Sequence, residues 1–141
     1  MAGKDLKLEL LRNVPLFSGC ATHEMRFISK LADEVEVPAG KVLAEQGATG
    51  HEFFIVVTGS LRVERDGAVI NRMGPGDFAG EIALIDRGPR TATLVADVPS
   101  RVLVIGQREF HSLLLEYPSI QITVLQALAR RVRHTDPEAI H

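Results

Sequence analysis

Short apolar runs separated by closely spaced glycines are the feature that most restricts how this chain can fold. Between Val35 and Ile105, runs rich in Val, Ile and Phe alternate with turns that contain glycine. The glycines that interrupt this region are Gly40, Gly47, Gly50, Gly59, Gly67, Gly74 and Gly76. Short strands with turn signals at such intervals are typical of an antiparallel sandwich or barrel. The middle of the chain is therefore predicted to be all-β.

Two of these turns have specific local chemistry. Asp66-Gly67 lies between the apolar-containing runs 61–65 and 68–70, which is a strong signal for a two-residue hairpin because glycine adopts positive φ without steric cost. Gly74-Pro75-Gly76-Asp77 marks a second tight turn.

Helical patterns flank the glycine-rich region on both sides. Apolar residues recur at helical spacing in segments 6–11, 22–31, 110–114 and 119–132, and Pro137 limits the last of them. The fold class expected is therefore α+β: an antiparallel β-roll, similar to a jelly-roll barrel, flanked by N-terminal and C-terminal helices. One domain is predicted over 1–141, with a helical part at 1–33, the β-roll at 34–106 and closing helices at 107–136.

Composition narrows the class of protein. The chain has 141 residues, 45% apolar and 24% charged, which suits one soluble globular domain. Sixteen basic and eighteen acidic residues give a net charge of -2, so the chain lacks the basic excess that nucleic-acid and membrane surfaces usually carry. The single cysteine, Cys20, excludes an internal disulfide, and neither a signal peptide nor a membrane-length apolar stretch is present. A cytoplasmic location is expected.

The segment 76–93 departs from simple strand-and-turn patterns. One helical turn at 80–84 would point free backbone N–H groups in one direction and bind an anion, and Gly80 permits close approach of the backbone. Arg90 can add a planar guanidinium to a phosphate, and Glu81 can accept from a sugar hydroxyl. Together they suggest a nucleotide. The alternative is that Glu81 and Arg90 only form a salt bridge across a loop.

The passage Phe78-Ala79-Gly80-Glu81-Ile82-Ala83-Leu84, followed by Pro89-Arg90-Thr91-Ala92-Thr93, resembles the phosphate-binding cassette of cyclic-nucleotide-binding domains. The similarity extends over almost the whole chain and includes Gln46-Gly47, Gly59-Ser60 and the closing helices. It implies a non-catalytic sensor or regulatory module that binds cyclic AMP or cyclic GMP, with cyclic AMP favoured, and that needs no other cofactor or metal.

The resemblance also implies roles for individual residues. Glu81 would accept from the ribose 2′-hydroxyl, Arg90 would pair with the cyclic phosphate, and backbone N–H groups near Ile82, Ala83 and Thr91 would complete the phosphate shell. Val63 and Met73 match positions that line the ribose and base, although ordinary core packing would also explain both. At the end of the last helix, Thr135 is a candidate for contact with the base, and Arg131 is a candidate for contact with the base or the ribose.

One position departs from the family pattern. His51 stands where the family often has an aspartate that steadies the phosphate-binding arginine. A neutral histidine cannot replace that charge, so either Glu52 or Asp77 takes over the role, or Arg90 is held less firmly.

Other functions fit the residues less well. A cupin-type metal enzyme would need clustered ligands, but the five histidines are scattered along the chain. A catabolite-activator-type transcription regulator would carry a DNA-reading domain after the last helix, and direct nucleic-acid binding by this chain is not expected. The alternative is that the chain is the ligand-binding half of such a regulator or of another multidomain effector. That helix has a second apolar row, Leu125, Leu128 and Val132, beside the row Ile120, Val124 and Ala127. The second row suits either a partner, such as a second copy in a homodimer, or deeper packing.

Overall fold

The computed structural model describes residues 2–80, 84 and 88–135, with side chains between residues 6 and 130 of that set. They form two compact units: Met1–Lys30 together with Ser112–His141, and Leu31–His111. The first unit is helical and the second is built mainly of strands.

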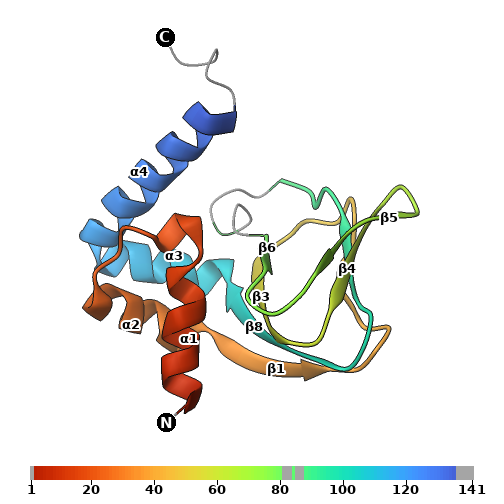
Figure 1. Ribbon diagram of the computed structural model, residues 1–141. Helices are drawn as coiled ribbons and strands as arrows, with labels where there is room; N and C mark the ends of the chain where they lie inside the picture. The colour runs from red at the N-terminus through yellow and green to blue at the C-terminus, as the bar shows by residue number, and fades with distance from the viewer. Residues whose placement is uncertain (1, 81–83, 85–87, 136–141) are drawn as a thin grey trace. The chain divides into compact units, whose positions relative to one another are not determined.

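The strands of the second unit pair into two four-stranded antiparallel sheets, in the orders β1-β8-β3-β6 and β2-β7-β4-β5. Figure 1 labels β1, β8, β3 and β6 of the first sheet and β4 and β5 of the second. Their bounds are β1 Asp33–Val37, β2 Val42–Ala44, β3 Glu52–Thr58, β4 Leu61–Arg65, β5 Ala68–Met73, β6 Phe78–Ala79, β7 Thr93–Ala96 and β8 Ser100–Gly106. The predicted α+β class with an antiparallel β-roll is confirmed.

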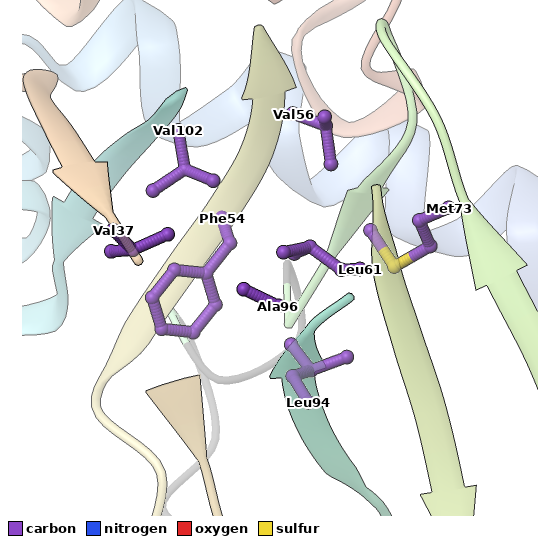
Figure 2. Packing of buried hydrophobic residues seen from close by; sticks show 8 residues of the cluster. All are labelled: Val37, Phe54, Val56, Leu61, Met73, Leu94, Ala96 and Val102. Atoms are coloured by element: carbon purple, nitrogen blue, oxygen red, sulfur yellow. The ribbon is translucent and has the colours of Figure 1, made fainter. Parts of the chain in front are cut away.

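The core of this unit takes side chains from both sheets, as Figure 2 shows. Its members are Val37, Phe54, Val56 and Val102 from the first sheet and Leu61, Met73, Leu94 and Ala96 from the second. Strand residues alternate between faces, so β4 buries Leu61 and turns Arg62 away from the core. Burying these apolar side chains is what stabilises the pairing of the two sheets.

The hairpin between β4 and β5 is the turn that Asp66-Gly67 predicts. Both residues have positive φ, 53° for Asp66 and 82° for Gly67, as a two-residue hairpin of the I′ kind requires. The second predicted turn is also present: the Asp77 N–H donates to the Gly74 carbonyl at 3.0 Å, and the Gly74 N–H donates to the Asp77 carboxylate at 2.8 Å.

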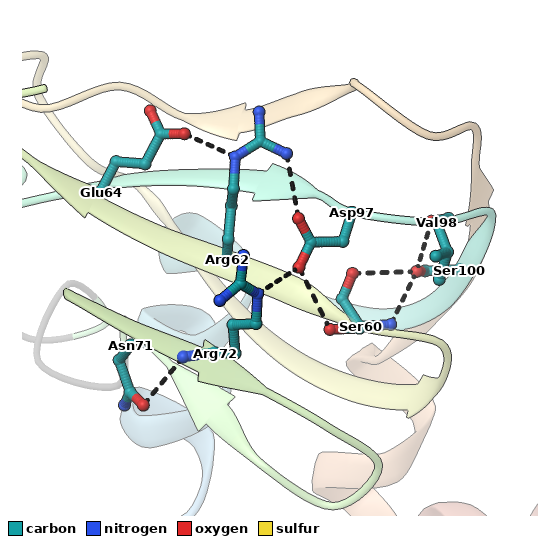
Figure 3. A network of polar contacts seen from close by, with 8 residues as sticks. All are labelled: Ser60, Arg62, Glu64, Asn71, Arg72, Asp97, Val98 and Ser100. Carbon is teal, nitrogen blue, oxygen red and sulfur yellow. Dashed lines mark hydrogen bonds and ion pairs between the residues drawn. The ribbon is translucent and has the colours of Figure 1, made fainter. Parts of the chain in front are cut away.

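A polar network covers the outward face of the second sheet (Figure 3). Asp97, in the turn after β7, accepts from Arg62 at 3.0 Å and from Arg72 at 3.1 Å, and Arg62 also pairs with Glu64. Hydrogen bonds from Arg62 and Arg72 lower the pKa of the Asp97 carboxyl, and the bond from Arg62 has the largest effect. The network ties β4, β5 and this turn together without using any residue of the core.

The helical unit contains the segments expected at the two ends of the chain. Its elements are α1 Ala2–Arg12, the 3₁₀ helix η1 Pro15–Phe17, α2 Thr22–Leu31, the second half of α3 Gln107–Glu116, and α4 Pro118–Thr135. The 3₁₀ helix η1 lies between the two helical segments predicted at the N-terminal end, and it buries both Leu16 and Phe17. No helix within the described part of the chain has the length and apolarity needed to cross a membrane.

The two apolar rows of α4 have different surroundings. The row Ile120, Val124 and Ala127 is buried, with exposed fractions of 0%, 3% and 8%. Leu125 of the second row is 61% exposed, and Leu128 is half-buried. The first row is therefore the one that the chain itself packs.

Candidate functional site

A cavity of about 320 Å³ lies in the strand-built unit and collects several of the predicted site residues. Its described lining consists of Ala44, Val63, Arg65, Ala79, Gly80, Gly88, Pro89, Arg90, Thr91, Ala92 and Leu94. Most of these residues are apolar or glycine, while the two arginines carry its positive charge. An amphipathic lining of this kind suits a ligand with an anionic group and a larger apolar part.

The loop between β2 and β3 holds Arg90 through its backbone. The Arg90 N–H donates to the Ala48 carbonyl at 2.7 Å, and the Gly47 N–H donates to the Arg90 carbonyl at 2.8 Å. Thr49 and Pro89 form an isolated antiparallel bridge at the same place. Arg90 is therefore anchored at its main chain before its side chain makes any contact.

The Arg90 side chain is held by neutral groups. Its Nη2 donates to the backbone carbonyl of Glu52 at 2.6 Å, and its Cζ lies 5.5 Å from the centre of the Phe54 ring. Burial lowers the pKa of the guanidinium, and the charge of Glu52 opposes that effect. Among the described residues, no carboxylate forms an ion pair with Arg90. Within the described part of the chain, the charge of Arg90 is therefore not neutralised by direct contact with a carboxylate.

Neither of the two carboxylates proposed to take over the role of the aspartate that His51 replaces, Glu52 and Asp77, forms a described ion pair with Arg90. Glu52 contributes, through its backbone carbonyl and through its charge. The Asp77 carboxylate instead accepts from the Gly74 N–H within its own turn. The His51 side chain is exposed, and its carbonyl accepts from the Gln107 N–H.

Two glycines leave the space that the Arg90 side chain fills. A Cβ on Gly50 would lie 2.1 Å from Arg90 Nε, and a Cβ on Gly80 would lie 2.6 Å from Arg90 Nη1. Gly80 also has a φ of 84°, which side chains rarely adopt. The sequence pattern predicts close backbone approach at Gly80, but nothing in the sequence connects Gly50 with Arg90, 40 positions away.

Arg65 is a residue of the cavity that sequence analysis missed. It ends β4, two positions after Val63, and both residues line the cavity. Its Nε donates to the Thr91 carbonyl at 3.0 Å. Side chains along a strand alternate between its two faces, so residues 63 and 65 share a face. Once Val63 is predicted to line the site, the same alternation also predicts Arg65.

The remaining predicted site residues have different positions. Met73 is buried at 5% exposure in the core cluster and is not among the described residues that line the cavity. Glu81, Ile82 and Ala83 lie outside the described residues. Arg131 and Thr135 lie in α4, and their side chains are also outside the description. Their ligand contacts, and that of Met73, stay predictions.

The described residues give no support to the alternative of a cupin-type metal enzyme. In the described part of the chain, no three His, Cys, Asp or Glu side chains are grouped so that they could hold a metal ion.

Comparison with known proteins agrees with this geometry. The family profile described as "Cyclic nucleotide-binding domain" matches residues 34–117. The chain belongs to the cyclic nucleotide-binding domain family. The match covers the β-roll of the domain, including every residue that lines the cavity.

Relatives of this cyclic nucleotide-binding domain are regulatory proteins. It is 28% identical over 133 residues to the CRP-like cAMP-activated global transcriptional regulator of Mycobacterium tuberculosis, covering 91% of this chain. It is 34% identical over 115 residues to the cAMP-dependent protein kinase regulatory subunit of Mycosarcoma maydis, covering 75% of this chain. The crystal structure of the N-terminal domain of a transcriptional regulator from Streptomyces coelicolor superimposes with a TM-score of 0.84 at 30% identity, covering 92% of this chain and 96% of that one.

The chain is shorter than these curated relatives. The matched region spans 59% of the length of the mycobacterial regulator and 22% of the kinase regulatory subunit.

Proposed function

We propose that this domain binds a 3′,5′-cyclic nucleotide, cyclic AMP in preference to cyclic GMP, and serves as a regulatory module without catalytic activity. The observation that carries the proposal is the Arg90 guanidinium in a mostly apolar cavity, held by the Glu52 carbonyl and the Phe54 ring and left without a described carboxylate partner. A guanidinium that the protein holds in place inside a concave site can pair with a phosphate without being reoriented.

In this proposal Arg90 pairs with the cyclic phosphate while Val63, Ala44 and Leu94 contact the apolar faces of the sugar and base. Gly80 gives the backbone close access to the phosphate. Glu81 accepts from the ribose 2′-hydroxyl, and the N–H groups of Ile82, Ala83 and Thr91 complete the phosphate shell. The preference for cyclic AMP is supported by the names of two relatives: the mycobacterial regulator is called cAMP-activated, and the fungal kinase is called cAMP-dependent.

The proposal extends to how binding is reported. Arg131 and Thr135 would contact the base and so couple the ligand to the end of α4, and the row that contains the exposed Leu125 would meet a second copy or another partner. No direct contact with nucleic acid, no metal and no further cofactor is part of this proposal, and the cytoplasm is the compartment proposed. The second candidate is the ligand-binding half of a catabolite-activator-type transcription regulator, favoured by the similarity to two transcriptional regulators.

A ligand-induced thermal shift tests the proposal. Cyclic AMP at about 100 times its Kd should raise the free energy of unfolding by roughly 2.7 kcal/mol, because only the folded domain binds it. The measurement compares the melting temperature with no ligand, with millimolar cyclic AMP and with millimolar cyclic GMP. Arg90→Ala should abolish the shift, whereas Arg108→Ala, an exposed arginine outside the cavity lining, should keep it. The absence of any shift with either nucleotide would refute the proposal.

A further inference from the structure

Arg65 gives the cavity a second guanidinium besides that of Arg90. Cross-strand register puts Glu64 of β4 opposite Thr93 of β7, so Arg65 lies level with the residues that immediately follow Arg90. The hydrogen bond from Arg65 Nε to the Thr91 carbonyl agrees with that position. The apolar residues Val63 and Leu94 pair directly one step further along the same two strands. The positive charges are therefore gathered at one end of this strand pair.

The position of Arg65 is fixed by its neighbour in the hairpin. Gln46 forms two hydrogen bonds with Asp66: its Nε2 donates to Asp66 Oδ1, and its Oε1 accepts from the Asp66 N–H, both at 2.9 Å. The Gln46 N–H also donates to the Thr93 hydroxyl at 2.9 Å. The loop that anchors the Arg90 main chain thus also anchors the end of β4 from which Arg65 projects.

The Arg65 guanidinium retains donors for a ligand. Among the described residues, the guanidinium forms one hydrogen bond, from Nε to the Thr91 carbonyl, and an arginine has five N–H donors in total. Among the described residues, no carboxylate forms an ion pair with Arg65. No described residue of the lining carries a carboxylate either. The described wall of the cavity therefore holds two guanidiniums whose charge no lining residue offsets.

We propose that Arg65 is a further ligand-binding residue of this cavity and that it contacts the phosphate of the cyclic nucleotide together with Arg90. This inference rests on the proposed function and adds a second cation to the phosphate site. Hydrogen bonds between charged groups are the strong ones, so Arg65 contributes to affinity for every 3′,5′-cyclic nucleotide, whatever its base.

Titration of Arg65→Gln with both nucleotides tests the inference. Loss of one charged hydrogen bond should weaken binding about tenfold, and by the same factor for cyclic AMP and cyclic GMP, because they share the phosphate. A loss confined to one nucleotide would assign Arg65 to the base and overturn the proposal, as would unchanged affinity for both.

The dependence of Kd on salt concentration gives a second test. Arg65→Gln removes a cation, so this dependence should fall if the guanidinium meets the phosphate, and an unchanged dependence would contradict the inference. Arg108→Gln makes the same change of charge at an exposed position outside the described lining, and it should keep the affinity and the salt dependence of the unmodified chain. If the unmodified chain binds neither nucleotide, the proposed function fails and takes this inference with it. If it binds both and Arg65→Gln binds them equally well, only this inference fails.

Discussion

At the scale of single residues, the site depends on glycine, which has no side chain, as much as on Arg90. Arg90 passes through the space that Gly50 leaves empty, and it reaches the Glu52 carbonyl at 2.6 Å. Gly50 does not have the positive φ that favours glycine, so its importance is steric rather than conformational. Gly50, which has no side chain, thus determines where the Arg90 guanidinium lies in the cavity.

Gly50→Ala is expected to weaken nucleotide binding. The new Cβ would lie 2.1 Å from Arg90 Nε and 2.5 Å from Cδ, which forces the arginine side chain away from the Glu52 carbonyl. Cyclic AMP affinity, measured by calorimetric titration, should fall about tenfold or more because the charged contact to the phosphate is misplaced. Gly74→Ala is the matched control: no atom lies within 4 Å of its added Cβ, so its affinity should be unchanged. Equal affinities for the two variants would show that the position of Arg90 does not limit binding.

At the scale of elements, a buried carboxylate connects α2 with the first turn of α4. Glu24 accepts from the Ser119 hydroxyl and from the Ala21 N–H, and it is 7% exposed. These two hydrogen bonds, with that from Ser119 the stronger influence, lower the pKa of Glu24 from its ordinary value of 4.5. Since the folded pKa is the lower one, the ionised carboxylate stabilises the fold above pH 4.5, and this contribution is lost as the pH falls through the folded pKa.

Ser119→Ala should therefore destabilise the helical unit in a pH-dependent way. Loss of the hydroxyl removes one hydrogen bond to a charged group and should cost about 1.5 kcal/mol near neutral pH. The difference from the unmodified chain, measured by urea unfolding, should shrink once the pH falls below 4.5. Ser29→Ala removes a hydroxyl that donates only to the Arg26 carbonyl, within α2, and its smaller effect should not change with pH. A loss for Ser119→Ala that is constant with pH would mean that Glu24 is not its partner.

At the scale of the whole molecule, the two compact units raise the question of how a ligand in one affects the other. The cavity belongs to Leu31–His111, while α4 belongs to the helical unit. If nucleotide binding draws Arg131 and Thr135 to the base, the ligand favours one position of α4 over others and so acts as a switch.

Hydrogen exchange with and without cyclic AMP tests this coupling. Slower exchange is expected at residues 78–92, which include the proposed binding site, and also at 119–135 if the ligand orders the end of α4. Exchange in α1 (Ala2–Arg12) serves as the internal reference and should change little. Protection that is confined to residues 78–92 would mean a site that binds without signalling through α4.

Local patterns in the sequence were sufficient for the elements that depend on neighbouring residues. Asp66-Gly67 predicted the hairpin because positive φ is a property of those two residues, and the spacing of Ile120 and Val124 predicted the buried face of α4. The family resemblance added Arg90 as the phosphate-binding residue and Val63 as part of the wall, and both line the cavity.

What only the tertiary structure decided was which distant groups meet. The Glu52 carbonyl that holds Arg90 is 38 residues away in sequence, and the Thr91 carbonyl that engages Arg65 is 26 residues away. Met73 looked equally suited to the cavity wall or to the core, and the register that sets it opposite Leu61 buries it in the core. Contacts of this kind follow from strand register and from the packing of two sheets, which fix many residues at once. No periodicity or motif within one segment encodes them.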